Sequence, residues 1–123
     1  MASVARVLVV EDDPAVAKVL ELALKREGFQ PHLVRDYPSA LAVLGEDWDA
    51  ILLDLNLPGG FGLNLLRHLR GTLGKRTPVL VLSGLRQEHH VLEALRAGAQ
   101  DYLTKPFSPK ELVLRLERYV ASR

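Results

Sequence analysis

The sequence predicts a doubly wound α/β fold, in which one five-stranded parallel sheet is covered by helices on both faces. Two observations predict this class. Short apolar runs rich in β-branched residues recur along the chain, as in strands that are buried on both faces of a parallel sheet. A segment with apolar residues at helical spacing follows each run, so strands and helices alternate over the 123 residues.

The first strand and helix show the pattern most clearly. Residues 7–10 form a continuous apolar run that stops at three acidic residues, 11–13. Asp13 is suited to cap a helix whose first position is Pro14, and apolar residues recur at helical spacing until Gly28. We therefore expect a strand, an acidic turn and a helix.

The unit of strand and helix then recurs four times. The further strands are expected at residues 30–35, 50–53, 79–82 and 102–104. Their helices are marked by Leu41 and Leu44, by Leu65, Leu66 and Leu69, by Val91, Leu92 and Leu95, and by Leu112, Leu116 and Val120. A turn is expected at residues 57–60, and Ser108 and Glu111 predict a capping box at the start of the last helix.

Alternating strands and helices imply right-handed crossovers and a parallel sheet. The commoner small arrangement is the flavodoxin-like strand order 2-1-3-4-5, in which ligands bind beyond the carboxyl ends of the strands. Polar residues stand at these ends, namely Glu11 and Asp12 after the first strand, Asp54 at the third, Ser83 at the fourth and Lys105 after the fifth. We therefore expect them to converge on one rim of the sheet.

Carboxylates that converge on a rim repel one another. Two like charges about 4 Å apart cost roughly 4 kcal/mol at an effective dielectric constant near 20. A shared proton or a bound cation must offset this cost, and an oxygen-only site completed by water suits Mg²⁺. One carboxylate can then act as a nucleophile toward a phosphoryl group, while Lys105 neutralises charge and Ser83 donates a hydrogen bond. The expected product is an acyl phosphate.

Composition limits the remaining function classes. A chain of 123 residues fits a single domain, expected to span residues 1–123. Its formal charge of +1 gives no bulk attraction to nucleic acid or to acidic membranes, so direct binding of either is not expected. The absence of cysteine and of a long apolar run in the sequence predicts a cytoplasmic protein.

Four motifs at the expected strand ends resemble the response-regulator receiver domains of two-component signalling. They are VLVVEDD at residues 7–13, ILLDLNLP at 51–58, PVLVLS at 78–83 and GAQDYLTKPF at 98–107. Together they cover nearly the whole chain. Residues 107–112 resemble, with Arg115, the receivers that precede a winged-helix DNA-binding domain, so the chain is expected to be a standalone receiver or a fragment of a longer transcription regulator.

The resemblance implies a phosphoprotein rather than a classical enzyme, a signalling domain that catalyses its own phosphorylation and dephosphorylation. Asp54 would be the phosphoacceptor, and its donor would be a sensor histidine kinase or a phosphotransfer protein. Glu11, Asp12, Asp54 and the backbone carbonyl of Asn56 would hold Mg²⁺.

The same resemblance implies how phosphorylation would be sensed. Ser83 would be the switch hydroxyl, Tyr102 the switch aromatic residue and Lys105 the phosphate-binding lysine. The bond between Lys105 and Pro106 would be cis, as is usual in the family.

The output surface would comprise the fourth helix, fifth strand and fifth helix, and it would form a homodimer on phosphorylation. Asp101 and Arg115 match an ion pair across the dimer of the winged-helix subfamily, and Glu111 matches one half of another. The basic partner of Glu111 would fall at Val91, which is apolar. We therefore expect a weak, salt-sensitive dimer.

Three positions depart from the family pattern. Gly84 stands where an alanine usually follows the switch hydroxyl, Phe61 where a small polar or acidic residue is usual, and Gln100 where the closest subfamily tends to have an acid. None of them belongs to the expected chemical site. They bear on loop flexibility, partner choice and the lifetime of the phosphoryl group.

Three other functions are compatible with an acid after a parallel strand, and each meets an obstacle. A phosphatase of the haloacid-dehalogenase type usually has a second acid two residues after its nucleophile, where this chain has Asn56. A receiver-like binding module that is never phosphorylated usually lacks an acid or the lysine, and this chain has all of them. A flavin-binding domain needs a phosphate loop after the first strand, where the acids would repel a phosphate.

Overall fold

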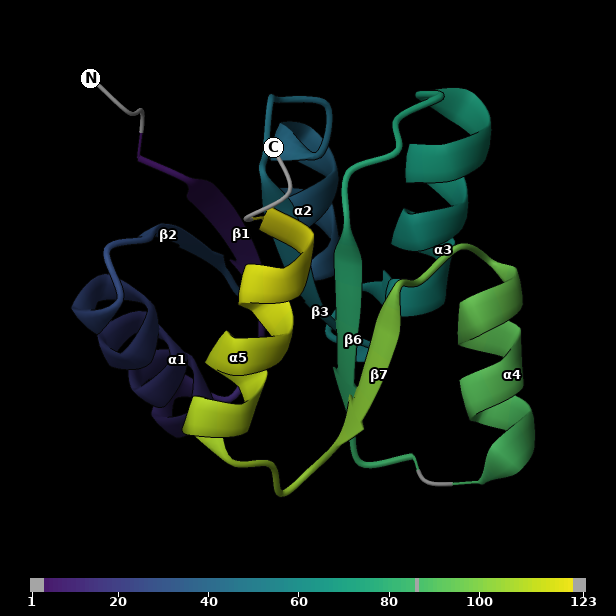
Figure 1. Ribbon diagram of the computed structural model, residues 1–123. Helices are drawn as coiled ribbons and strands as arrows, with labels where there is room; N and C mark the ends of the chain where they lie inside the picture. Colours follow the sequence, from purple (N-terminus) through teal and green to yellow (C-terminus); the bar gives the residue numbers. More distant parts are fainter. Residues whose placement is uncertain (1–3, 86, 121–123) are drawn as a thin grey trace.

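The central sheet has the strand order that the sequence predicts. The computed structural model describes residues 4–85 and 87–120, and it contains a five-stranded parallel sheet in the order β2-β1-β3-β6-β7 (Figure 1). Its strands are β1 (Arg6–Val10), β2 (Gln30–Val34), β3 (Ala50–Asp54), β6 (Val79–Ser83) and β7 (Asp101–Thr104). This is the order 2-1-3-4-5 among the parallel strands, which confirms the predicted fold class. Each strand differs from its expected bounds by a single residue.

Helices cover both faces of the sheet (Figure 1). They are α1 (Pro14–Arg26), α2 (Tyr37–Val43), α3 (Gly62–Arg67), α4 (Glu88–Arg96) and α5 (Pro109–Val120). One apolar cluster joins the sheet to α1 and α5, and a second joins it to α2, α3 and α4. Among the described residues, no helix combines the length and the apolar character that a membrane crossing requires.

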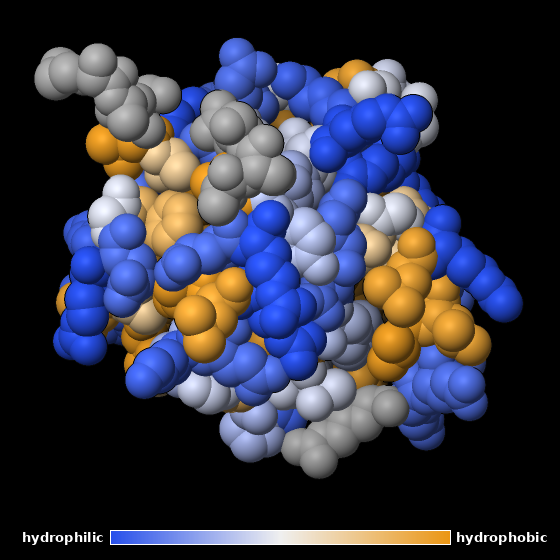
Figure 2. Space-filling view, in the orientation of Figure 1, coloured by the Kyte–Doolittle hydropathy of each residue, from blue (hydrophilic) through white to orange (hydrophobic). Residues whose placement is uncertain are grey.

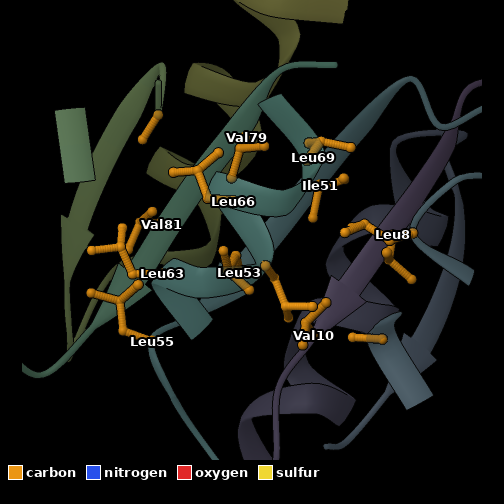
Figure 3. Packing of buried hydrophobic residues seen from close by; sticks show 14 of the residues in the cluster. Leu8, Val10, Ile51, Leu53, Leu55, Leu63, Leu66, Leu69, Val79 and Val81 are labelled. Carbon is orange, nitrogen blue, oxygen red and sulfur yellow. The ribbon is translucent and has the colours of Figure 1, made fainter. Parts of the chain in front are cut away.

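The core holds the strand ends in place, because alternate strand residues point to opposite faces of the sheet. Figure 3 shows the side facing α3, with side chains from three adjacent strands: Leu8, Val10, Ile51, Leu53, Val79 and Val81. Each of these side chains is at most 2% exposed. Burying each such side chain contributes roughly 1.5–3 kcal/mol. A few of them therefore offset a repulsion of about 4 kcal/mol between acids at the strand ends.

The helix starts follow the sequence in one case and depart from it in another. Asp13 caps α1 as predicted, because its carboxylate accepts hydrogen bonds from the backbone N–H groups of Ala15 and Val16. At α5, the Ser108 hydroxyl accepts from the N–H of Glu111 at 3.3 Å. The Glu111 carboxylate accepts from Arg115 at 2.6 Å, one turn along the helix. The predicted capping box is thus only half formed, since a cationic donor attracts the carboxylate more strongly than a backbone N–H group.

Two local structures were not predicted. The turn after β3 contains a small antiparallel hairpin of β4 (Asn56–Leu57) and β5 (Gly60–Phe61). The helix α3 continues into a π-helical turn, η1 (His68–Thr72), after which the N–H of Leu73 donates to the carbonyl of His68 at 2.9 Å. Neither structure has a clear signature in the hydrophobic pattern, because the two hairpin strands have only two residues each and η1 has only five.

Arg70 in the π-helical turn connects three segments. Its guanidinium donates to the carbonyl oxygens of Gly98 and Lys75 and to the side-chain oxygen of Gln100, at 2.8–3.3 Å. The same Gln100 oxygen accepts from the N–H of Val79 at 2.7 Å. Gln100, one of the departures from the family pattern, therefore fixes the start of β6 and the turn between α4 and β7.

Gly62 is the glycine at which we expect an added methyl group to destabilise the fold most. A Cβ at Gly62 would lie 2.3 Å from the carbonyl oxygen of Asp54 and 2.9 Å from the Cα of Leu55. Both contacts are with backbone, so the end of β3 must shift. We expect Gly62→Ala to lower the free energy of unfolding by about 1–3 kcal/mol in urea titrations. The control is Gly71→Ala, which meets nothing within 4 Å and should change that free energy by less than about 1 kcal/mol. Equal losses in both variants would contradict this account.

Candidate functional site

The carboxyl ends of four strands meet on one rim, and the polar residues singled out in the sequence stand there. Glu11 and Asp12 follow β1, Asp54 ends β3, Ser83 ends β6 and Lys105 follows β7. The register aligns these ends, because Val10 of β1 pairs with Leu53 of β3, and Asp54 pairs with Leu82 of β6.

Three carboxylates form an acidic cluster on this rim. Oxygen atoms of Glu11, Asp12 and Asp54 all lie within 4.8 Å of one another. Glu11 is 1% exposed and Asp54 5% exposed, whereas Asp12 is exposed, so the cluster reaches solvent on the Asp12 side. The N–H of Asn56 donates to Asp54 Oδ1 at 3.1 Å and orients that carboxylate.

Lys105 bridges the two buried acids. Its Nζ lies 3.0 Å from Asp54 Oδ2 and also donates to Glu11 Oε1. Burial opposes the charge on Lys105, but the hydrogen bonds to Glu11 and Asp54 outweigh it and keep the pKa of Lys105 above its ordinary value. The lysine therefore remains a cation at the centre of the site. The peptide bond that follows it, between Lys105 and Pro106, is cis, as the resemblance implies.

Lys105 does not fully compensate the cost of burying a charge on Glu11. Its burial, with the neighbouring Asp54 carboxylate, raises the pKa of Glu11 to about 7, although Lys105 acts in the opposite direction. Glu11 Oε2 is buried and has no hydrogen-bond partner within the described part of the chain. Such an atom calls for an explanation. An oxygen-only donor set with one unpartnered carboxylate oxygen fits a hard divalent cation such as Mg²⁺.

Ser83 and Tyr102 meet at the loop that follows β6. The fully buried Ser83 hydroxyl accepts from the N–H of Leu85 at 3.1 Å, and the Tyr102 hydroxyl donates to the carbonyl of Leu85 at 2.6 Å. Among the described residues, neither hydroxyl bonds to the acidic cluster. Leu85, which the sequence did not single out, is therefore the physical link between these two side chains. Its backbone groups make the contacts, and backbone groups leave no signature in a sequence.

Asp101, Glu111 and Arg115 form a separate group on β7 and α5. Arg115 donates to Asp101 at 2.9 Å and to Glu111 at 2.6 Å, all within one chain. The Asp101 carboxylate also accepts from the N–H of Tyr102 at 2.9 Å. These contacts thus join β7 to α5 within a single molecule, and an ion pair of Arg115 across a dimer would have to replace them.

A comparison with known protein families identifies the family of the chain that carries this site. The profile of the response regulator receiver domain matches residues 7–117. The chain belongs to this family. As a receiver, it is a phosphoacceptor domain of two-component signalling, whose members generally use Mg²⁺.

Known receivers agree with the assignment in both sequence and fold. The phosphate regulon transcriptional regulatory protein PhoB of Escherichia coli is 45% identical over 114 residues, which are 91% of this chain and 50% of PhoB. The DNA-binding response regulator MtrA of Mycolicibacterium smegmatis is 42% identical over 112 residues, 90% of this chain and 48% of MtrA. The receiver domain of the Francisella response regulator 1452 superimposes with a TM-score of 0.91 at 33% identity, covering 96% of this chain and 98% of that one. The chain spans about half the length of the curated relatives PhoB and MtrA.

Proposed function

We propose that Asp54 of this receiver accepts a phosphoryl group from the phosphohistidine of a sensor histidine kinase or a phosphotransfer protein. One observation carries the proposal: the Lys105 ammonium lies 3.0 Å from one oxygen of a buried carboxylate that stands in an acidic cluster. This ammonium would stabilise the negative charge on the phosphoryl oxygens as the group approaches Asp54. A structural ion pair would need only one acid, and here Glu11 already supplies it.

The transfer balances as a displacement at phosphorus. An oxygen of the Asp54 carboxylate attacks, the bond from phosphorus to the histidine nitrogen breaks, and that nitrogen keeps the electron pair. The product is an acyl phosphate. Hydrolysis restores the unmodified carboxylate: water attacks the phosphorus, the bond from phosphorus to the aspartyl oxygen breaks, that oxygen leaves as a carboxylate, and inorganic phosphate departs.

The metal would be held by Glu11, Asp12, Asp54 and the backbone carbonyl of Asn56. When bound, Mg²⁺ offsets the repulsion among the carboxylates and neutralises charge on the phosphoryl oxygens. Lys105 supplies the second positive charge, and Asn56 keeps the Asp54 carboxylate oriented through its N–H group.

The proposal is tested by incubating the protein with Mg²⁺ and acetyl phosphate. Intact-mass spectrometry should show one added phosphoryl group, and peptide mapping should place it on Asp54. The adduct should be labile in base and absent when EDTA replaces Mg²⁺. A stable adduct, or one on another residue, would overturn the assignment.

The signal would leave the site through Leu85. On phosphorylation, the Ser83 hydroxyl would turn from the N–H of Leu85 to donate to a phosphoryl oxygen, and the loop that Tyr102 also holds would move with it. The change would thereby reach α4, β7 and α5.

Ser83→Ala should uncouple this movement from the chemistry. We expect the variant to be phosphorylated, yet to lose most of the beryllofluoride-induced shifts of the Leu85 and α4 amides in NMR spectra. Ser83→Thr keeps the hydroxyl and should restore them. Wild-type shifts in Ser83→Ala would remove this hydroxyl from the signal.

The surface formed by α4, β7 and α5 would mediate a two-fold homodimer on phosphorylation. Arg115 would exchange its internal partners Asp101 and Glu111 for those of the second copy, while Val91 offers apolar burial in place of an ion pair. Exposed pairs are each worth about 0–1 kcal/mol, so the dimer should be weak and should weaken further with salt. Sedimentation at high micromolar concentration should give a monomer without beryllofluoride and a dimer with it. A monomer in both states would instead favour a different protein as the partner on this surface.

The domain is proposed to span residues 1–123 as a single cytoplasmic receiver, either standalone or part of a longer transcription regulator. Its relatives PhoB and MtrA are named as transcriptional and DNA-binding regulators. With a formal charge of +1, this domain itself is not proposed to bind nucleic acid or membranes.

A further inference from the structure

Asn56 lies outside the five-stranded sheet, in the small hairpin that follows β3. The hairpin pairs Asn56 with Phe61 and Leu57 with Gly60, and each of its strands has two residues. The N–H group of Asn56 donates to Asp54 Oδ1 at 3.1 Å, and its carbonyl belongs to the proposed Mg²⁺ ligands. A two-stranded hairpin of this size is at best marginally stable by itself. Other contacts must therefore fix the position of Asn56.

Tyr37, the first residue of α2, makes such contacts with the hairpin. Its N–H group donates to the carbonyl oxygen of Pro58 at 2.9 Å. Its ring lies directly on Gly60, because a Cβ added to Gly60 would lie 2.7 Å from two carbons of that ring, Cγ and Cδ2. A glycine at this position is therefore what lets the aromatic ring reach the backbone of the hairpin.

The turn of the hairpin is built for the same close approach. Its central residues are Pro58 and Gly59, and Gly59 has a φ of 89°. Proline followed by a glycine with positive φ is the sequence that a type II turn requires. A Cβ on Gly59 would lie 2.9 Å from Cδ of Pro38. The start of α2 thus packs on the hairpin through two consecutive residues, Tyr37 and Pro38.

The start of α2 is itself held in place by the core. Asp36 caps the helix, because its carboxylate accepts from the N–H group of Ser39 at 2.7 Å. Ala40 is fully buried in the apolar cluster between the sheet and α2, and the ring of Tyr37 packs against the same cluster. The helix therefore gives the hairpin a fixed support that is separate from β3, the strand that carries the phosphoacceptor.

This contact is also separate from the output surface. Figure 2 shows the side of the molecule with α5 and α4, where apolar side chains gather over α4. In the same view, α2 lies behind the sheet (Figure 1). A change at Tyr37 therefore leaves the residues of the proposed dimer surface in place.

We propose that Tyr37 is a positioning residue for phosphoryl transfer, which holds the hairpin so that the backbone of Asn56 meets both Asp54 and the metal. It acts through Asn56, since its contacts with the site run through the hairpin. The role of the metal in this inference rests on the proposed function, whereas the contact between ring and hairpin does not. A ring that served packing alone would affect stability and leave the affinity for Mg²⁺ unchanged.

Tyr37→Ala removes the ring and keeps the N–H group. In NMR titrations, its Kd for Mg²⁺ should be about tenfold higher than that of the wild type, as when a residue that orients a metal ligand is lost. In EDTA, the amide hydrogen of Asn56 should exchange faster relative to that of Leu53 in β3, because the hairpin opens while the sheet stays closed. Tyr37→Phe keeps the ring and should restore both properties.

Phe29→Ala is the matched control for lost packing. It removes an aromatic ring that packs against the opposite face of the sheet, between α1 and β2. This variant should be less stable than the wild type, with an unchanged Kd for Mg²⁺ and an unchanged ratio of exchange rates at Asn56 and Leu53. If it raised the Kd as much as Tyr37→Ala does, or if Tyr37→Ala kept the wild-type ratio, Tyr37 would not be a positioning residue.

Gly60→Ala tests the contact from the other side. Gly60 is not among the glycines with positive φ, and the three atoms nearest to an added Cβ belong to the ring of Tyr37. The variant should therefore raise the Kd for Mg²⁺ and speed exchange at Asn56, while the double variant with Tyr37→Ala should be no worse than Tyr37→Ala alone. Additive losses would overturn the proposal.

Two further outcomes are decided by the same measurements. If Tyr37→Ala did not fold, Gly60→Ala would displace the ring in an otherwise intact chain, and wild-type values in that variant would refute the role of Tyr37. A wild type that bound no Mg²⁺ would refute the metal site of the proposed function. Exchange at Asn56 in EDTA would still decide whether Tyr37 positions the hairpin.

Discussion

Asp54→Asn is expected to reduce phosphorylation by acetyl phosphate to background while the protein remains folded. The amide has almost the same shape as the carboxylate, but its oxygen is too weak a nucleophile to attack phosphorus. It can still accept the hydrogen bond that Asp54 Oδ1 receives from the N–H of Asn56. Removing one negative charge also relieves the repulsion between Asp54 and Glu11, so the free energy of unfolding should not fall below that of the wild type.

Intact-mass spectrometry and urea unfolding would measure the two effects separately. Asp47→Asn is the matched control, because it makes the same change of side chain at a fully exposed position before β3. Its modification should equal that of the wild type. If Asp54→Asn were phosphorylated as readily as Asp47→Asn, the acceptor would be another residue. If Asp54→Asn unfolded, the test would be repeated with Asp54→Ala, whose loss of modification must then match.

The site could be anticipated from the sequence because its parts lie at the ends of regular elements. The buried run of β1 ends at Glu11, and that of β3 ends at Asp54, so the parallel strand order alone brings them together. Lys105 follows from the same rule applied to β7. These predictions need only the direction of the strands and the side of the sheet on which they end.

Contacts that depend on competition between partners could not be anticipated in this way. The sequence predicts that Glu111 accepts from the N–H of Ser108 in a capping box, whereas in the structure it accepts from the guanidinium of Arg115. The meeting of Ser83 and Tyr102 at Leu85 likewise depends on the path of a loop. Sequence spacing gives the possible partners, whereas the choice among them follows from relative positions that only the folded chain defines.

Lys105→Ala is expected to change four properties of the protein: its stability, its affinity for Mg²⁺, its phosphorylation and its response to beryllofluoride. Without Mg²⁺, Glu11 and Asp54 lose the cation that they share while both remain buried. The free energy of unfolding should then fall by about 1–3 kcal/mol. The affinity for Mg²⁺ should rise, because the lysine no longer competes for the same carboxylates. Phosphorylation should be weak but detectable, and the beryllofluoride-induced shifts of the Leu85 and α4 amides should be absent.

Urea titrations at several Mg²⁺ concentrations separate the loss of stability from the gain in Mg²⁺ affinity. A ligand that binds only the folded state stabilises it by RT ln(1 + [L]/Kd). Mg²⁺ should therefore stabilise Lys105→Ala more than the wild type. Lys110→Ala removes the same side chain from an exposed position on α5 and should behave as the wild type in every measurement. If Mg²⁺ stabilised both variants equally, Lys105 and the metal would not share the carboxylates. If Lys105→Ala kept the wild-type shifts at Leu85, the ammonium would have no part in carrying the signal from Asp54 to α4.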